Sequence, residues 1–314
     1  MSEHSERVVY LNGAFVPEGA ASISVRDRGL SYGDGVFDTA RTFAGRLFRA
    51  EEHVRRLYES LAYVRIDPGL SAAEMLAATE ELVARNLPAL REGEDYWVTQ
   101  RVTSGEAALD GEPAPTGGAT VLIDCVPLPL RARARYFRDG IDAVVPARRR
   151  VPPEALSPNA KTLNYMNVAL AQREVEALRP GAWALMCDRN GDLAEGPGSN
   201  LFVVKDGVVW TPPTDFILAG VSRQVVIELC ARLGLPLREA AVPLHLAMTA
   251  EEAFFTSTSL CACPLRSLNG RPFPGGAPGP VTRRIMDAFV AEVRYDYVAQ
   301  YLRFLGDGAA RTGL

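Results

Sequence analysis

The stretch SPNAKTLNYMN, residues 157–167, places Lys161 where a strand end is expected to turn into a helix. The stretch LAEGPGSNLFVV, residues 193–204, follows the turn letters DRNGD, carries Glu195 and leads into a further strand. A lysine amine can form a Schiff base with a carbonyl group, and a buried carboxylate can hold a pyridine nitrogen in its protonated form. Together, the two stretches indicate the chemistry of pyridoxal phosphate, which needs both groups.

The composition is that of an ordinary globular protein. The 314 residues include 47% hydrophobic and 23% charged side chains, and this length allows two domains of typical size. A formal net charge of −4 provides no global positive field for nucleic acid. Apolar runs of 18 residues are absent, and the start MSEHSERVVY lacks the apolar core of a signal peptide. A cytoplasmic protein without a membrane partner is therefore expected.

Neither disulfides nor a metal site are indicated. The cysteines number five and lie among apolar neighbours, which argues against a disulfide framework. Cys261 and Cys263 have no second pair of cysteines or histidines nearby to complete a zinc site, and we assign them no chemistry. The chain has only three histidines, so we expect no bound metal.

The first part of the chain, residues 1–126, is predicted to be an N-terminal α/β domain. A strand is expected from Val36 onward, and residues 51–64 form an amphipathic helical stripe. Ser71 with Glu74 three residues later is a capping box, which predicts the start of a second helix.

The second part of the chain begins after a change in composition. VPLPLRARARY contains two prolines and three arginines, and this predicts an interdomain linker over residues 127–136. Residues 137–314 then alternate strands and helices and form the C-terminal domain. Because both parts mix sheet and helix, the fold class is α+β, or mixed α/β. The arginines at 148–150 stand ahead of two prolines and are interpreted as a solvated edge.

A cofactor that carries a phosphate also needs an anion site. Gly220 precedes a predicted helix whose first amides and dipole would favour a phosphate. Residues 256–259, TSTS, add hydroxyl groups at a strand end, and Arg56 can supply a cation while Arg55 points elsewhere. A surface position for both arginines is the open alternative.

These motifs, taken in order, resemble the class IV aminotransferases, which are fold-type IV pyridoxal phosphate enzymes. That family includes branched-chain and D-amino acid aminotransferases, R-selective amine transaminases and aminodeoxychorismate lyases. The resemblance spans nearly the whole chain and implies a smaller N-terminal and a larger C-terminal domain. The matching segments are DRGLSYGDGVFDTAR (27–41), HVRRL (53–57), KTLNYMNVALA (161–171), LAEGPGSNLFVV (193–204), ILAGVSRQVVIEL (217–229) and EEAFFTSTS (251–259).

The resemblance implies a role for each matching position. Lys161 is implied to form the internal aldimine and to carry the proton, and Glu195 is implied to be the partner of the pyridine nitrogen. A homodimer is also implied, with each site completed by a loop of the other subunit. The remaining implied contacts are Arg56, Val221, Ser222 and Thr258 at the phosphate, Tyr165 at the phenolic oxygen, and Ser199 and Asn200 near the ring.

The substrate side departs from the branched-chain pattern. That subfamily usually carries Tyr-Ile-Arg-Pro, whereas residues 96–99 read YWVT and place a valine where the arginine is expected. Arg101 is more similar to the arginine of D-amino acid aminotransferases and can hold a carboxylate, although strand alternation also allows a solvated position. FDTAR, residues 37–41, is similar to the lyases as well. The substrate candidates are Phe37, Arg41, Trp97, Arg101 and Ser259, with Tyr32 and Leu260 as possible pocket walls.

The sequence thus predicts a pyridoxal phosphate-dependent aminotransferase. Its donor is expected to be a branched-chain L-amino acid, a D-amino acid or a primary amine, and its acceptor a 2-oxo acid. Elimination of pyruvate from aminodeoxychorismate on the same scaffold is the alternative. A non-catalytic cofactor-binding protein is a third reading, which the presence of both Lys161 and Glu195 disfavours.

Overall fold

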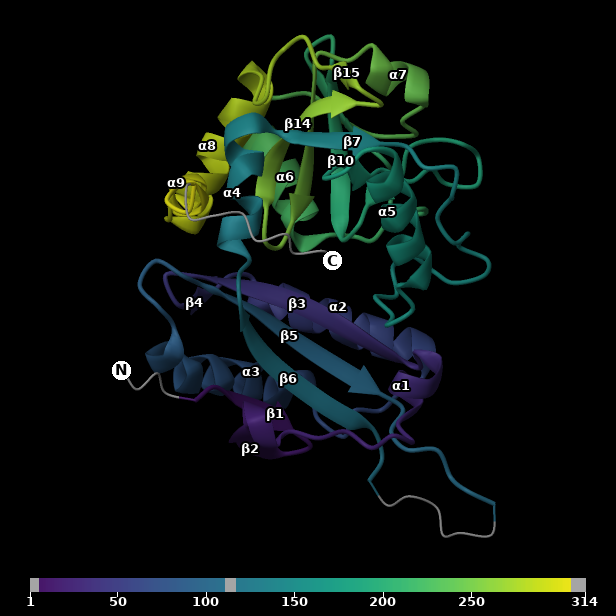
Figure 1. The fold of residues 1–314 in the computed structure, drawn as a ribbon, viewed down its shortest axis with the longest axis vertical. Helices are drawn as coiled ribbons and strands as arrows, with labels where there is room; N and C mark the ends of the chain where they lie inside the picture. The colour runs from purple at the N-terminus through teal and green to yellow at the C-terminus, as the bar shows by residue number, and fades with distance from the viewer. Residues whose placement is uncertain (1–5, 111–116, 306–314) are drawn as a thin grey trace. The chain divides into compact units, whose positions relative to one another are not determined.

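The computed structural model describes residues 6–110 and 117–305, which fall into two compact units (Figure 1). Unit 1 comprises Met1–Leu128 and Ala160–Asn164, and unit 2 comprises Pro129–Asn159 and Tyr165–Leu314. Each unit combines a β-sheet with helices, so the predicted fold class is confirmed.

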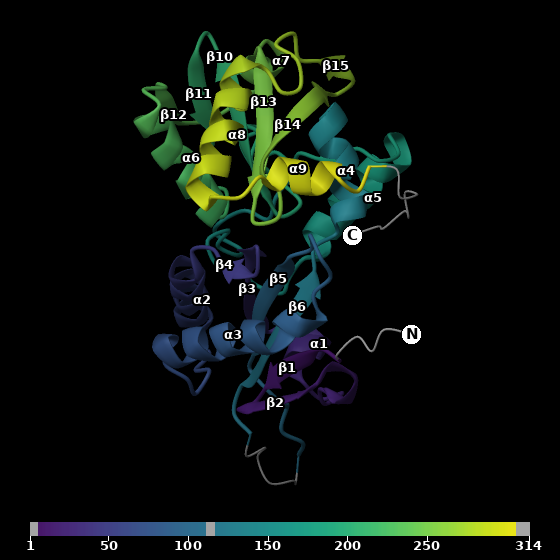
Figure 2. The same ribbon diagram turned by 90° about the vertical axis from the view of Figure 1, so that its left-hand side faces the viewer.

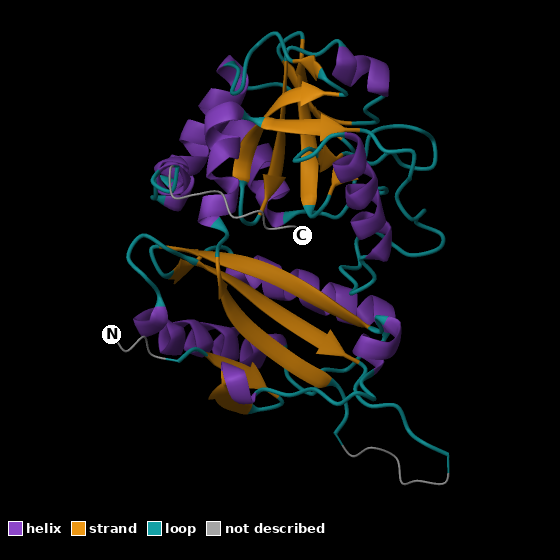
Figure 3. Ribbon diagram, viewed as in Figure 1, coloured by secondary structure: helices purple, strands orange, loops and turns teal. Residues whose placement is uncertain are grey.

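Unit 1 is built on one sheet with the strand order β2-β1-β6-β5-β3-β4. Helices α2 and α3 pack on one face of this sheet, and Figure 3 shows both lying along it. The elements are β1 (Val8–Leu11), β2 (Ala14–Pro17), α1 (Arg28–Tyr32), β3 (Gly35–Phe43), β4 (Arg46–Leu47), α2 (Ala50–Val64), α3 (Ala72–Asn86), β5 (Tyr96–Thr103) and β6 (Thr120–Pro127), with short 3-10 turns at Glu18–Ala20 and Leu87–Ala89.

Both helices of unit 1 follow from their local sequence. In α2, Val54, Leu57 and Leu61 form one buried stripe, as the spacing predicts. In α3, the Ser71 hydroxyl accepts a hydrogen bond from the Glu74 amide, and the Glu74 carboxylate accepts one from the Ser71 amide. The predicted capping box is therefore confirmed, a feature whose removal typically costs about 1 kcal/mol.

The segment Ala160–Asn164 joins unit 1 although it is distant from the rest of that unit in sequence. The Phe37 amide donates to the Lys161 carbonyl at 2.9 Å, and the Leu163 amide donates to the Gly35 carbonyl at 2.9 Å. A Cβ atom at Gly35 would lie 2.6 Å from the Val102 carbonyl oxygen, so glycine is needed for this close approach. The result is that Lys161 is held beside β3.

Unit 2 contains a second sheet, in the order β12-β11-β10-β13-β14-β7-β8, with β9 paired to β10 and β15 paired to β14. Helices α6 and α8 pack on β13 and β14, and Figure 2 shows α8 lying across these strands. The elements are α4 (Leu130–Asp139), β7 (Ile141–Val144), α5 (Met166–Leu178), β8 (Trp183–Ala184), β9 (Glu195–Gly196), β10 (Ser199–Lys205), β11 (Val208–Thr211), α6 (Val221–Arg232), β12 (Leu237–Glu239), α7 (Leu244–Met248), β13 (Glu252–Ser257), β14 (Cys261–Leu268), β15 (Arg271–Pro272), α8 (Pro280–Val293) and α9 (Tyr297–Leu302).

The stretch predicted as a linker, 127–136, has a different structure. Most of it belongs to α4, which buries Leu130, Ala134 and Phe137 within unit 2. These three residues are spaced at four and three positions, which is a helical stripe. The two prolines precede the helix instead of interrupting a loop, because Pro129 occupies the N-cap position. Residues 130–136 of the predicted linker are therefore part of a helix of unit 2, whereas Pro127 ends β6 in unit 1.

None of the helices within the described ranges combines the length and apolar character that crossing a bilayer requires. The first five residues of the amino-terminal stretch lie outside those ranges. Over the same described residues, no group of three or more His, Cys, Asp or Glu side chains is placed to hold a metal ion.

Candidate active site

Lys161 is fixed by its neighbours in unit 1. Its amide donates to the Ser60 hydroxyl at 3.1 Å, and that hydroxyl donates to the Arg56 carbonyl on α2 at 2.9 Å. Its carbonyl accepts from the Phe37 amide on β3. The Nζ atom lies 4.4 Å from the centroid of the Phe37 ring, a cation–π distance. The lysine is thus half-buried and positioned from two sides, unlike a typical surface lysine.

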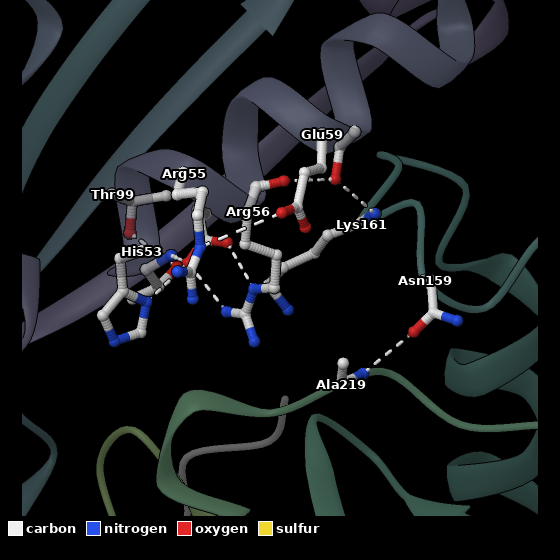
Figure 4. A network of polar contacts seen from close by, with 11 residues as sticks. His53, Arg55, Arg56, Glu59, Thr99, Asn159, Lys161 and Ala219 are labelled. Atoms are coloured by element: carbon white, nitrogen blue, oxygen red, sulfur yellow. Dashed lines mark hydrogen bonds and ion pairs between the residues drawn. The ribbon is translucent and has the colours of Figure 1, made fainter. Parts of the chain in front are cut away.

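A buried carboxylate, Asp38, organises the polar groups near this lysine. Asp38 accepts from Nε and Nη2 of Arg56 at 2.7 and 2.8 Å, and the Nδ1 atom of His53 lies 2.7 Å from its Oδ1 atom. The Thr39 amide also donates to Asp38, at 2.7 Å. Figure 4 shows Arg56 and His53 converging from α2, whereas Arg55 turns toward Glu59. Arg56 therefore points inward and Arg55 outward, as the sequence indicates.

The charges in this cluster are strongly coupled. Burial alone raises the pKa of Asp38, but the charge of Arg56 and the hydrogen bonds from His53 and Arg56 outweigh it and hold the pKa below its usual value. Burial lowers the pKa of His53. Asp38 raises this pKa and the charges of Arg56 and Lys161 lower it further, so that the net change is downward. Asp38 is consequently ionised and His53 neutral at neutral pH. Because an ionised carboxylate only accepts, His53 donates from Nδ1.

The substrate candidates of unit 1 share one face of the sheet. In the antiparallel register, Phe37 is opposite Arg101, and Arg41 is opposite Trp97. Arg101 donates to Asp124 at 2.8 Å with its side chain 37% exposed. Arg41 is 1% exposed, lies 4.0 Å from the Phe43 ring centroid and donates to the Thr42 carbonyl. Arg101 thus lies at an accessible position of the face and Arg41 within its interior.

Glu195 occupies a buried position in unit 2. Its Oε1 atom pairs with Nη2 of Arg150 at 2.8 Å. Its Oε2 atom accepts from the Leu218 amide at 3.1 Å and from the Asn200 side-chain amide at 3.3 Å. Asn200 in turn donates to the Leu218 carbonyl at 2.9 Å. This carboxylate is therefore oriented by three donors from separate segments, which a simple turn residue would not need.

The predicted anion site begins α6. Its N-cap is Gly220, and no side chain caps the amides that follow, among them those of Val221 and Ser222. A Cβ atom at residue 220 would lie 2.1 Å from the Asn200 side-chain oxygen, so only glycine allows this approach. The same asparagine thus contacts both the Glu195 carboxylate and the start of α6. Exposed helix amides of this kind attract anions.

Two hydroxyl groups on neighbouring strands lack partners. Within the described residues, the buried Ser199 Oγ and Thr256 Oγ1 atoms have no hydrogen-bond partner. Thr256 lies directly opposite Asn200 across β10 and β13, and Asn200 lies opposite Glu195 across β9 and β10. Buried polar atoms without a partner carry a free-energy cost that a bound polar group removes. Thr256 shares the face of Asn200 and Glu195, whereas alternation along β10 turns Ser199 to the other face. The unpaired Thr256 hydroxyl therefore fits a bound group with an acceptor atom beside Glu195.

The end of β13 carries the remaining hydroxyl candidates. Thr258 and Ser259 lie in the turn that joins β13 to β14. The Ser259 hydroxyl accepts from Arg133 of α4, and its carbonyl accepts from the Tyr301 hydroxyl at 2.8 Å. Tyr165 is the N-cap residue of α5 and is 37% exposed. Ser259 is therefore held by the surrounding fold, whereas Tyr165 is placed at an accessible helix start.

The sequence motifs did not identify three residues of these clusters as part of the site: Asp38, His53 and Arg150. Asp38 and His53 lie within matched segments, and both are polar residues on the inward side of β3 or α2, which is a detectable sign of a buried cluster. Arg150 was interpreted as part of a solvated run. The run is indeed exposed at Arg149, but the Arg150 side chain is only 17% exposed because its amide is bonded to the Cys187 carbonyl.

The residues present fit pyridoxal phosphate. Unit 1 offers a positioned lysine amine, and unit 2 offers an oriented carboxylate, an uncapped helix start and the unpaired hydroxyl of Thr256. Each of these groups has the chemistry that the cofactor's carbonyl, ring nitrogen and phosphate require.

Comparison with known proteins gives consistent results. The family profile described as Amino-transferase class IV matches residues 35–268. A protein of Methanocaldococcus jannaschii, provisionally named a branched-chain-amino-acid aminotransferase, is 37% identical over 284 residues, covering 90% of this chain and 94% of its own. The D-alanine aminotransferase of Bacillus licheniformis is 33% identical, covering 89% and 95%. The branched-chain amino acid aminotransferase of Thermobaculum terrenum, solved in its PLP-containing holo form, is 27% identical, covers 96% and 98%, and has a TM-score of 0.81.

Proposed function

The chain belongs to the class IV aminotransferases, and on this premise we propose that it transfers the amino group of a branched-chain L-amino acid or a D-amino acid to a 2-oxo acid. The resemblance seen in the motifs is confirmed, as is the expectation of a pyridoxal phosphate-dependent transaminase. The proposed donors are supported by relatives named for branched-chain amino acids and for D-alanine at similar identity. A primary amine remains the further donor to be tested.

Lys161 is proposed as the catalytic residue. Bound pyridoxal phosphate supplies a carbonyl that amines condense with and a ring that accepts electrons. Lys161 binds that carbonyl through Nζ, and the same nitrogen moves the proton once the donor has displaced it. Its main chain is held by Ser60 and Phe37, so only the side chain needs to move. This fixed backbone keeps the amine directed to one side.

Glu195 is proposed to hold the ring nitrogen in its protonated form. Arg150, Asn200 and the Leu218 amide orient its carboxylate before the cofactor binds. A carboxylate that is already oriented loses little conformational freedom on binding, so its interaction with the ring nitrogen is stronger. We infer that Arg150 is a positioning residue for this contact.

The other cofactor contacts are proposals of the same kind. The phosphate is assigned to the amides of Val221 and Ser222, supported by the uncapped start of α6, together with Thr258 and Arg56. Asp38 holds the Arg56 guanidinium in one orientation, which favours binding of a phosphate oxygen over a mobile surface role. Ser199 and Asn200 are assigned to the ring, and Tyr165 to the phenolic oxygen.

The assembly is proposed to be a homodimer in which a loop of each subunit completes the other's site. We propose functional domains that follow the two compact units, with the boundary after Leu128 and with Ala160–Asn164 assigned to the first. Sedimentation equilibrium of the holoenzyme tests the dimer, and a mass of one chain at micromolar concentration would contradict it.

The observation that carries the proposal is the positioned Lys161 amine, 4.4 Å from the Phe37 ring, in a chain that also holds an oriented Glu195. The test is a half-reaction screen, in which the holoenzyme is mixed with single L- and D-amino acids and amines. Conversion of the bound cofactor's absorbance to that of pyridoxamine phosphate by leucine or D-alanine is expected. Absence of conversion by every donor would contradict the proposal, and pyruvate release from aminodeoxychorismate without an acceptor would support the lyase.

A further inference from the structure

The face of the unit 1 sheet that carries Phe37 is also the face of the Lys161 amine. Side chains alternate along a strand, so Phe37 and Arg41 of β3 and Arg101 of β5 share this face. The Lys161 Nζ atom lies over the Phe37 ring, and Phe37 is the cross-strand partner of Arg101. Directly opposed side chains in antiparallel strands are close neighbours. Arg101 therefore lies beside Phe37, the side chain that contacts the lysine amine.

Arg101 does not present an isolated positive charge. Its Nη1 atom donates to Oδ1 of Asp124 at 2.8 Å. Asp124 lies on β6 opposite Thr99, so it belongs to the same face and is a diagonal neighbour of Arg101. The two side chains are 37% and 18% exposed, so the pair is accessible from this face.

The charge of Arg41, the second arginine that β3 and β5 place on this face, is also compensated. Nη2 of Arg41 lies 4.0 Å from Oδ2 of Asp95, and these side chains are 1% and 0% exposed. Each of the two arginines that β3 and β5 place on this face thus has an aspartate partner. The charges of these two guanidinium groups near the lysine amine are therefore largely compensated.

A compensated arginine selects its ligands differently from an isolated one. Asp124 is tethered beside Arg101 and competes with any incoming carboxylate for the guanidinium. Its own negative charge also repels a second carboxylate that approaches. Every 2-oxo acid has one carboxylate, so the discrimination concerns a second one on the side chain. An uncharged side chain beside Arg101 meets neither obstacle, whereas a side-chain carboxylate meets both.

We propose that Asp124 is a specificity-determining residue that favours 2-oxo acids with a single carboxylate over dicarboxylates such as 2-oxoglutarate. The proposal rests on the proposed transaminase function and adds the class of acceptor. Sequence matching alone found the arginine and missed its partner, because Asp124 lies on a different strand more than twenty residues away.

The first test compares kcat/KM for pyruvate and for 2-oxoglutarate in the wild-type holoenzyme and in Asp124→Asn. Asparagine keeps the shape and removes the charge. The ratio of 2-oxoglutarate to pyruvate is expected to rise about tenfold, the effect of gaining one charge-assisted contact. In the double variant Asp124→Asn with Arg101→Met, the ratio is expected to fall back to the wild-type value. Asp287→Asn, on the exposed side of α8, makes the same charge change elsewhere and should leave the ratio unchanged.

The second test measures binding without turnover. Titration calorimetry of the holoenzyme with glutarate and with 4-methylpentanoate should show glutarate bound about tenfold more tightly by Asp124→Asn, with 4-methylpentanoate altered by less than about twofold. An unchanged or lower preference for dicarboxylates in Asp124→Asn, in either assay, would overturn the proposal. If the wild-type enzyme transfers no amino group to any 2-oxo acid, the proposed function fails, while the binding titration still decides the role of Asp124.

Discussion

The cluster near Lys161 and the cluster around Glu195 each contain an arginine paired with a carboxylate, but the two side chains exchange roles. In unit 1, Asp38 is the holding group: it binds the Arg56 guanidinium through two hydrogen bonds, and the two side chains are 0% and 9% exposed. In unit 2, Arg150 is the holding group: it binds the Glu195 carboxylate through one contact, and the exposures are 17% and 8%. In each cluster, the held group is the one assigned to the cofactor.

The difference between the clusters lies in how much of the fold depends on them. The Asp38 cluster is bidentate, buried and joined to His53 and the Thr39 amide, so losing one partner leaves uncompensated charge inside unit 1. The Glu195 cluster keeps two other donors, Asn200 and the Leu218 amide, if the arginine is removed. We therefore expect the first cluster to determine stability and the second to determine cofactor affinity.

Asp38→Ala should have the largest effect on stability. Removing one member of a buried ion pair typically costs about 3 to 5 kcal/mol, because the partner is left buried without compensation. Urea unfolding of the apoprotein measures this, with Asp67→Ala, at an exposed loop position, as the matched control that should change the unfolding free energy by less than about 1 kcal/mol. Equal stability of the two variants would show that the Asp38 cluster does not support the fold.

Arg150→Met should weaken cofactor binding while leaving the fold intact. Glu195 would then lose one of its orienting contacts, and we expect pyridoxal phosphate to bind about tenfold more weakly in equilibrium dialysis. Arg149→Met, at the exposed neighbouring position, is the matched control and should bind normally.

A positioning role for Arg150 also predicts a spectroscopic change. The pH at which the absorption of the bound cofactor changes should shift in Arg150→Met, remain in place in Arg149→Met and be restored in Arg150→Lys. If the affinity falls but this midpoint does not move, Arg150 is only structural and the contrast between the clusters is weaker than we infer.

The smallest expected effect is the pH dependence of stability due to His53. Burial lowers the pKa of His53 in the folded protein, so the unfolded chain binds the proton first as the pH falls below about 6.5. Protonation of this histidine in the unfolded chain therefore lowers the free energy of unfolding as the pH decreases through that range. Asp38, whose pKa is also lowered, contributes stability that is present above about pH 4 and is lost only at more acidic pH.

His53→Asn separates the two contributions. The asparagine amide can replace the Nδ1 donor to Asp38 but does not titrate. The decrease in Tm between pH 7.5 and 5.5 should therefore be smaller in His53→Asn than in the wild type. An identical decrease in both proteins would indicate that His53 is protonated in the folded state.

Much of the fold follows from local sequence patterns. The stripe of α2, the capping box at Ser71 and the start of α6 after Gly220 all depend on neighbouring residues, so they are found where they are predicted. The helix α4 was not predicted because the prolines and arginines of this stretch indicated a linker, although Leu130, Ala134 and Phe137 form an apolar helical stripe. Here burial within unit 2 decides the structure, which composition alone does not reveal.

The candidate site is harder to predict from the sequence because its charged side chains pair with residues far away along the chain. The Lys161 and Glu195 motifs are recognisable, yet the partners that hold them come from other segments. Asp38 meets Arg56 across β3 and α2, and only one of three consecutive arginines turns inward to Glu195. Which member of a charged run is buried depends on the path of the main chain, in this case the bond from the Arg150 amide to the Cys187 carbonyl.

The central claim is that the Lys161 nitrogen binds the cofactor carbonyl. The most direct measurement is reduction of the holoenzyme with borohydride, followed by proteolysis and mass spectrometry to locate the phosphopyridoxyl group. Our account predicts that this group is attached to Lys161 in the wild type and is absent from that peptide after preincubation with an effective amino donor. Attachment to any other amine in the wild-type protein would contradict it.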